Sequence, residues 1–217
     1  MNGLNTFTLK CIAIASMLID HIGAVLFPQY EWMRIVGRLA FPIFAYLLVE
    51  GFIYTKDVKK YLIRLGIFAL ISEIPFDLAF FRSFLYLGHQ NVFFTLFMGI
   101  LMLYSMKKTP GRVQQVLVMI SMLLISDWLC MDYGSWGLLM ILAFYEYRDK
   151  KSLKLVLIIL LNGLMWGMGY LTQVFAGFAV IPIWFHNRQL GPKMKLFFYV
   201  VYPAHLLILF LIRYFVW

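Results

Sequence analysis

The chain alternates between long apolar runs and short polar connections along its whole length. Each run approaches the ~20 residues that an α-helix needs to cross the hydrocarbon core of a bilayer. The pattern predicts nine membrane-spanning helices, although counts of eight or ten also fit, because the fourth, sixth and eighth runs are short. The predicted spans are approximately 9–27, 33–54, 61–81, 92–106, 113–131, 134–147, 153–170, 171–185 and 196–216.

Basic residues collect in every second connection between these runs. Four connections hold 14 of the 19 Lys and Arg residues, and the alternate connections hold only Arg82. Cytoplasmic loops of membrane proteins carry such an excess of positive charge. The alternation therefore predicts a cytoplasmic N-terminus and an external C-terminus. The basic connections are 56–64, 107–112, 148–154 and 188–195.

Composition supports a membrane protein. Of the 217 residues, 63% are hydrophobic and only 13% are charged. We expect an all-α polytopic integral membrane protein, with residues 1–217 forming one domain in the inner (cytoplasmic) membrane and the lipid bilayer as its partner. The net charge is +9, but most Lys and Arg residues lie in the connections between apolar runs, where they anchor cytoplasmic loops. We therefore exclude nucleic acid as a partner. The sequence leaves open whether the protein forms oligomers.

Several kinds of site are absent from the pattern. Cys11 and Cys130 lie in apolar runs without CxxC spacing or nearby His ligands, so we expect neither a disulfide nor a metal site. There is no HExxH helix, P-loop or dinucleotide glycine motif. Asp20 and His21 interrupt the first apolar run, which we interpret as a retained span rather than a cleaved signal.

Ionisable residues inside the spans are the strongest functional signal. A charged group at such depth costs about 2.5–3.5 kcal/mol even on insertion scales, so it needs a partner, a wet cavity or a chemical role. Asp20, His21 and Arg38 lie at similar depth in the first two spans. We expect Arg38 to pair with Asp20 or with a carboxylate of the third span, and Arg34 to reach the outer interface as an anchor. Glu50 lies in the inner half of its span, where it either lines a path or reaches toward Lys56 and Lys59.

Further candidates occur in later spans. Glu73 and Asp77 stand four residues apart around Pro75, Asp127 lies near the outer end of the fifth span, and Tyr202 and His205 flank Pro203. If Asp20, Glu73, Asp77 and Asp127 share a pocket with Arg38, that pocket is negative and favours a cationic acceptor such as a primary amine.

His21 is the leading candidate for chemistry, because a buried neutral imidazole is suited to take a proton from an amine or a hydroxyl. The alternative is a histidine that only hydrogen-bonds across helices. Arg38 has a similar alternative, a structural ion pair. Asn91, Asn162 and Gln173 are interpreted as ordinary hydrogen bonders between helices.

Four motifs together resemble the TraX family over nearly the whole chain. They are Asp20-His21-Ile22-Gly23, the run from Arg34-x-x-Gly37-Arg38 through Phe41-Pro42 to Glu50-Gly51, Ser72-Glu73-x-Pro75-Phe76-Asp77, and Tyr202-Pro203-x-His205. That family is named for a membrane acetylase of the pilin N-terminus and resembles transmembrane acyltransferases that use cytoplasmic acetyl-CoA. The resemblance implies a catalytic base at His21, supported by Asp20 and Arg38.

The resulting expectation is an acetyltransferase with acetyl-CoA as donor. Its acceptor is an amine or a hydroxyl reached from the outer side: a pilin N-terminus, a sugar or a small molecule. Glu50, Glu73, Asp77, Asp127, Tyr202 and His205 are the expected substrate-binding residues. Two other classes stay open: a proton-coupled transporter or channel, which uses the same intramembrane residue types, and a structural membrane subunit.

Overall fold

The predicted apolar runs are helical in the computed structural model, which describes residues 3–192 and 194–216. Among these residues there is no β-strand, only two isolated bridges. The helices are α1 (Thr6–Val25), α2 (Glu31–Gly37), α3 (Ala40–Tyr54), α4 (Val58–Phe81), α5 (Val92–Lys108), α6 (Arg112–Trp128), α7 (Gly134–Glu146), α8 (Lys151–Gly167), the 3₁₀ helix η1 (Leu171–Ala179), α9 (Val180–Trp184) and α10 (Lys195–Val216).

Polar side chains fix where several helices begin. Asn5 accepts a hydrogen bond from the Thr8 amide (2.9 Å), Asp57 from the Lys60 amide (3.0 Å) and Asn91 from the Phe93 amide (3.0 Å). These side chains satisfy amides that have no partner within the helix. They therefore set the starts of α1, α4 and α5.

The second predicted span differs from expectation, because it is broken into α2 and α3 at Arg38 and Leu39. Pro42 lies in the first turn of α3, where an N–H has no acceptor within that helix. The same proline leaves the Arg38 carbonyl without its i+4 donor. The eighth predicted span also differs, because it consists of η1 and the short α9.

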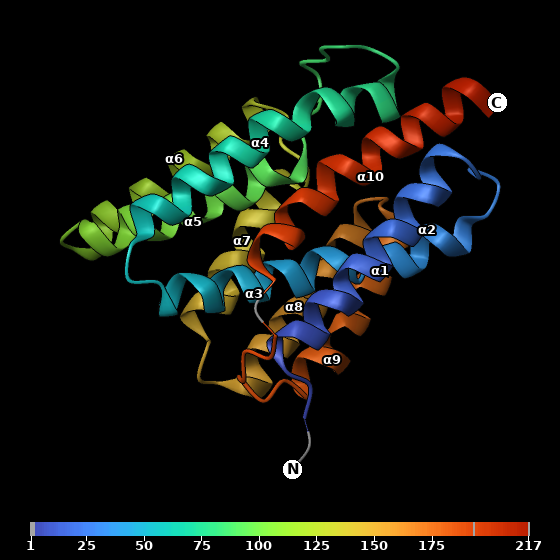
Figure 1. The fold of residues 1–217 in the computed structure, drawn as a ribbon. Coiled ribbons are helices and arrows are strands. Elements are labelled where there is room, and N and C mark those ends of the chain that lie inside the picture. The colour runs from blue at the N-terminus through green and yellow to red at the C-terminus, as the bar shows by residue number, and fades with distance from the viewer. Residues whose placement is uncertain (1–2, 193, 217) are drawn as a thin grey trace.

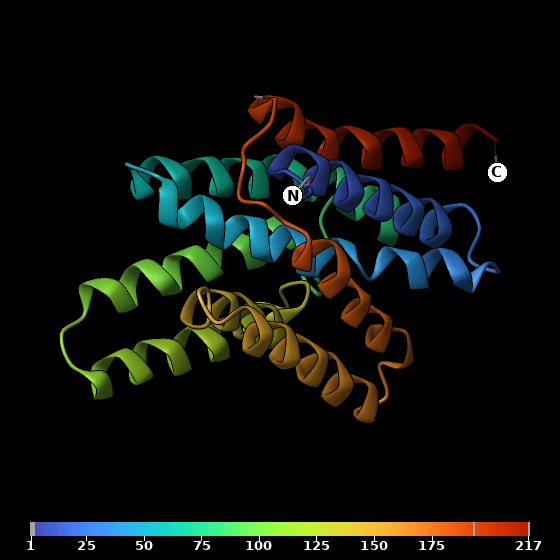
Figure 2. The same ribbon diagram turned by 90° about the horizontal axis from the view of Figure 1, so that it is seen from below.

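Helix α3 lies at the centre of the bundle. Eleven of its 15 residues are buried, and it packs against α1, α5 and α7. By contrast, Ser126 alone is buried among the described residues of α6. This helix lies at the edge of the bundle (Figure 2). The exposed residues of α6 are largely apolar, as expected of a surface that faces lipid.

The last helix packs beside the first. Helix α10 contacts both α4 and α1, as Figures 1 and 2 show from two directions. On the N-terminal side, residues preceding α1 join the segment after α9: the Leu4 amide donates to the Phe185 carbonyl (2.8 Å), and the Asn187 amide donates to the Leu4 carbonyl (2.9 Å). The segment before α1 is thus joined to the segment between α9 and α10.

Three helical segments of the described residues are long and apolar enough to cross a membrane: Thr6–Val25, Glu31–Tyr54 and Leu196–Val216. Helices α5, α6 and α8 have 17 residues each, near the lower limit for a span. The finding supports a membrane protein. The count of nine spans and their orientation stay predictions.

Candidate functional site

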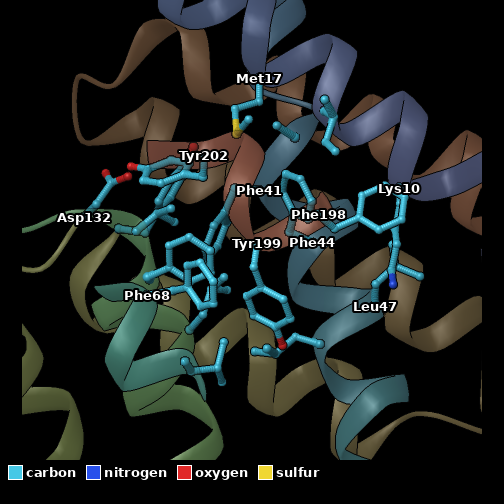
Figure 3. A pocket seen from close by; sticks show the side chains of 18 of the residues that line it. Lys10, Met17, Phe41, Phe44, Leu47, Phe68, Asp132, Phe198, Tyr199 and Tyr202 are labelled. Carbon is cyan, nitrogen blue, oxygen red and sulfur yellow. The ribbon is translucent and has the colours of Figure 1, made fainter. Parts of the chain in front are cut away.

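A cavity of about 910 Å³ lies among α1, α2, α3, α4, α5 and α10. One end is lined by Asp20, His21, Arg34 and Arg38, and the other by Lys10, Arg64 and Arg188. Aromatic and aliphatic side chains line the stretch between them. Figure 3 shows this middle part, with Phe41, Phe44, Phe68, Phe198 and Tyr199 between Lys10 and Asp132.

Asp20 is the centre of a buried ion cluster. Its carboxylate accepts from Arg38 Nη2 at 3.0 and 3.1 Å and lies 2.9 Å from Arg34 Nη1. Arg38 Nε also donates to the Arg34 carbonyl (3.2 Å), which holds the second guanidinium in place. The pairing of Arg38 with Asp20 is among those that the sequence predicts. The prediction for Arg34 is wrong, because this side chain binds Asp20 instead of only anchoring the helix.

Glycine at position 37 permits this approach. A Cβ atom there would lie 2.1 Å from Asp20 Oδ1 and 2.2 Å from its Cβ. The Ser16 hydroxyl donates to the Val36 carbonyl (2.5 Å) on the same interface. Helices α1 and α2 therefore pack closely enough for Asp20 to reach both arginines.

His21 is bonded to His205 of α10. The distance from His21 Nδ1 to His205 Nε2 is 2.7 Å, and the ring planes differ by 11°. Rings stacked face to face keep their atoms about 3.5 Å or more apart. The shorter N···N distance therefore places the two rings edge to edge, close to a common plane.

The second nitrogen of each ring, His205 Nδ1 and His21 Nε2, lies near an oxygen atom. His205 Nδ1 lies 2.7 Å from the Val201 carbonyl, which only accepts, so this nitrogen carries a proton. His21 Nε2 lies 4.0 Å from Asp20 Oδ2, beyond hydrogen-bond distance. Phe80 packs edge-on against the His21 ring at 5.4 Å between centroids, and Tyr202 at 6.0 Å.

A second pair of ionisable side chains, His89 and Asp132, lines the cavity. His89, in the loop between α4 and α5, lies 3.6 Å from Asp132 Oδ1 and packs against Phe76. The contact with Asp132 raises the pKa of His89, and burial opposes this shift. Next to Asp132, the Tyr133 ring stacks on Phe41 with 3.8 Å between centroids.

Glu73 and Asp77 lie beside this region but are not among the described residues that line the cavity. Asp77 Oδ2 accepts from the Tyr86 amide (2.8 Å), and Glu73 Oε2 accepts from the Asn91 amide (3.2 Å) and side chain. Both carboxyl groups thus hold the loop 82–91 against α4. Glu73 Oε1 and Asp77 Oδ1 are buried without a hydrogen-bond partner among the described residues.

Two further predicted residues lie away from Asp20: Asp127 does not line the cavity, and Glu50 lines its far end. Asp127 accepts from the Ser135 amide (2.7 Å) and shapes the turn between α6 and α7. Glu50 accepts from Arg148 Nε (3.0 Å) rather than reaching toward Lys56 or Lys59. The expected negative pocket is therefore wrong: of its four acids, only Asp20 lines the cavity, and two arginines accompany it.

The far end of the cavity is basic. Lys10 packs over the Phe198 ring at 4.8 Å, and Arg64 over the Tyr61 ring at 5.8 Å. His186 connects the Tyr46 hydroxyl (2.8 Å) with the Thr6 hydroxyl (3.1 Å). Among the described residues, Glu50 is the acidic side chain that lines this end, and its charge is balanced by Arg148.

Sequence reasoning missed several residues of the site. Arg34 has the i, i+4 spacing to Arg38 that could have suggested a shared partner. His89, Asp132 and His186 lie in loops, where periodicity carries no information about contacts. No three His, Cys, Asp or Glu residues gather as a metal site among the described residues.

Comparisons with known proteins agree with the earlier resemblance. The family model described as "TraX protein" matches residues 6–213. The chain is 31% identical over 94% of both chains to the probable fimbrial assembly protein FimC, serogroup H1, of Dichelobacter nodosus. It is 33% identical to the uncharacterized protein RP591 of Rickettsia prowazekii (strain Madrid E), over 68% of this chain and 58% of that protein.

No solved structure matches the chain. The family match covers nearly all of the cavity-lining helices, from the first residues of α1 to the last turns of α10. The chain belongs to the TraX family.

Proposed function

We propose that this protein is a membrane-embedded acetyltransferase that moves an acetyl group from acetyl-CoA to an amine or a hydroxyl. The observation that carries the proposal is His21 Nε2 at the end of an elongated cavity, 4.0 Å from a carboxylate. This ring nitrogen has no hydrogen-bond partner among the residues that the structure describes. Such a nitrogen is placed to act as a general base.

The two ends of the cavity suit the two parts of the donor. Lys10 and His21 are separated on α1 by roughly 16 Å at 1.5 Å per residue. The basic end suits phosphate groups, and the apolar middle suits a thin, uncharged arm that carries a thioester toward His21. With the positive-inside orientation, the basic end faces the cytoplasm, where acetyl-CoA is made.

The side chains then have distinct roles in transfer. His21 Nε2 accepts the proton that the acceptor atom loses as that atom bonds to the acetyl carbon. Arg34 and Arg38 bring two positive charges against the single charge of Asp20, and the excess stabilises the negative oxygen that develops on that carbon. Asp20 lies beside the imidazolium. His21 returns its proton to the sulfur when the carbon–sulfur bond breaks.

We also propose that the acceptor class includes the N-terminal amine of a pilin subunit. The D. nodosus relative, described as a probable fimbrial assembly protein, supports this choice. A sugar or small-molecule acceptor would bind at the same end, between Asp132, Arg34 and the aromatic rings of Phe80 and Tyr86.

The test measures transfer of labelled acetyl from acetyl-CoA in membranes that contain the protein. The acceptor panel holds a pilin-like N-terminal peptide, simple amines and a sugar. We expect His21→Ala to lower transfer at least 100-fold and Ser121→Ala, on the exposed face of α6, to leave it unchanged. Undiminished transfer by His21→Ala would reject the assigned base.

The same membranes separate this function from the alternatives. Reconstituted vesicles that move protons or solutes without consuming acetyl-CoA would establish a transporter instead. Full tolerance of alanine at both His21 and Glu73 would indicate a structural subunit.

A further inference from the structure

We infer that His205 is a positioning residue that fixes the protonated nitrogen of His21 and so presents His21 Nε2 as the base. The inference rests on the proposed function and adds to it the source of the base's orientation. It assigns the last helix of the chain a specific role in a reaction that is otherwise carried by α1 and α2.

The Val201 carbonyl decides the arrangement. Because a carbonyl oxygen only accepts, the 2.7 Å contact requires a proton on His205 Nδ1. For a neutral ring, His205 Nε2 then holds a lone pair. The 2.7 Å contact to His21 Nδ1 needs one proton between the nitrogens, so His21 Nδ1 supplies it. His21 Nε2 is left with the lone pair.

The surroundings hold both rings in this orientation. His205 is buried (8% exposed) and lies one turn after Val201 in α10. Its ring is therefore held by a carbonyl of the preceding turn of its own helix. Phe80 and Tyr202 pack edge-on against the His21 ring and block its rotation. A flipped His21 ring would place Cδ2 toward His205 and Nε2 at the position of Cε1, so the hydrogen bond to His205 would be lost.

The pair also favours the protonated state of His21 during transfer. Once Nε2 has taken the acceptor's proton, it faces Asp20 across 4.0 Å, and Nδ1–H donates to the neutral lone pair of His205. A hydrogen bond from a charged donor is roughly twice as strong as one between neutral groups. His205 thereby stabilises the imidazolium without touching substrate.

The competing explanation is that His205 only joins α10 to α1. Two substitutions separate these roles. His205→Gln keeps an acceptor oxygen near the position of Nε2, whereas His205→Leu keeps the packing volume but removes the acceptor. If His205 is only a contact between helices, both variants should transfer acetyl at a similar rate once they are folded.

We expect His205→Leu to lower kcat about 100-fold or more with little change in KM for acetyl-CoA, and His205→Gln to stay within about 10-fold of the unaltered protein. The pH profile of kcat should shift in His205→Leu because the base loses its hydrogen-bond partner. Equal kcat and pH profiles in both variants would overturn the inference. If His21→Ala abolishes transfer in that case, the proposed function still stands.

A second measurement does not depend on activity. Nitrogen chemical shifts of ¹⁵N-histidine-labelled protein report which ring nitrogen carries the proton, with His21→Gln and His205→Gln used to assign the signals. We expect Nδ1–H on both rings in the unaltered protein and a rise of the Nε2–H form of His21 in His205→Leu. An Nε2–H form of His21 in the unaltered protein would contradict the inference.

Discussion

At the residue scale, Asp20 holds together several ionisable side chains of the site. It is buried (7% exposed), yet it contacts two guanidinium groups and lies beside the ring of His21. Removing one partner of a buried ion pair leaves a charge that is buried and uncompensated. This costs more stability than replacing the whole pair by apolar side chains of similar volume.

Replacing Asp20 by Asn should therefore destabilise the protein by about 3 kcal/mol, the lower end of the range for broken buried pairs, because Arg34 retains partial exposure. Adding Arg38→Gln to this variant should restore part of the loss, since one unpaired charge is removed. Denaturation in detergent micelles measures both effects. Strict additivity of the two substitutions would show that the pair is not coupled.

His89 provides a pH-dependent prediction. Its pKa is raised in the folded protein, chiefly through the contact with Asp132, so its protonated form stabilises the fold. This contribution is fully present below the unfolded pKa of about 6.5 and is lost as pH rises through the higher folded value. Both side chains are partly exposed, which limits the effect to below about 1 kcal/mol.

The unaltered protein should accordingly exceed His89→Gln in unfolding free energy at pH 5.5, and the difference should vanish at alkaline pH. Urea denaturation of both proteins across that range provides the comparison. A difference that grows with pH would show that the Asp132 contact does not favour protonated His89.

At the scale of elements, the packing of α1 on α2 decides whether the ion cluster forms. Gly37 and Gly23 both lie in this contact: a Cβ at Gly23 would be 2.6 Å from the Cβ of Met33. In contrast, a Cβ at Gly163 in α8 would meet nothing within 4 Å. Gly37 in α2 and Gly163 in α8 therefore offer a matched pair of glycine substitutions.

Gly37→Ala should displace Asp20 and separate α1 from α2, with a stability loss of about 1–3 kcal/mol and a larger loss of acetyl transfer. Gly163→Ala should be neutral or stabilise by up to about 1 kcal/mol, since alanine restricts the unfolded chain. Thermal unfolding and the transfer assay test both variants. Equal effects would mean that the close α1–α2 approach has no special role.

The sequence predicted the helices well but not all of their partners. Apolar length located α1, α4 and α5 to within a few residues, because this signal is local. The break at Arg38 and Leu39 was missed because the apolar pattern continues through Pro42. The binding of Arg34 to Asp20 and the pairing of His21 with His205 depend on how helices pack, which periodicity does not encode.

For the whole molecule, orientation in the membrane is the property that a simple labelling experiment decides. Cys130 is an exposed free thiol in the turn between α6 and α7, which the alternation of basic loops places outside. A membrane-impermeant maleimide should label it in intact spheroplasts and not in inverted vesicles. Cys130→Ser, which retains Cys11, gives the background. Labelling only in inverted vesicles would reverse the proposed topology.

The His21–His205 contact also has a consequence for synthesis. Its two members are separated by 184 positions along the chain. At roughly 5–20 residues per second, a ribosome needs on the order of 10–40 s to make the second after the first. A partly translated polypeptide thus lacks this contact. On the proposed function, acetyl transfer would begin only after α10 has been inserted beside α1.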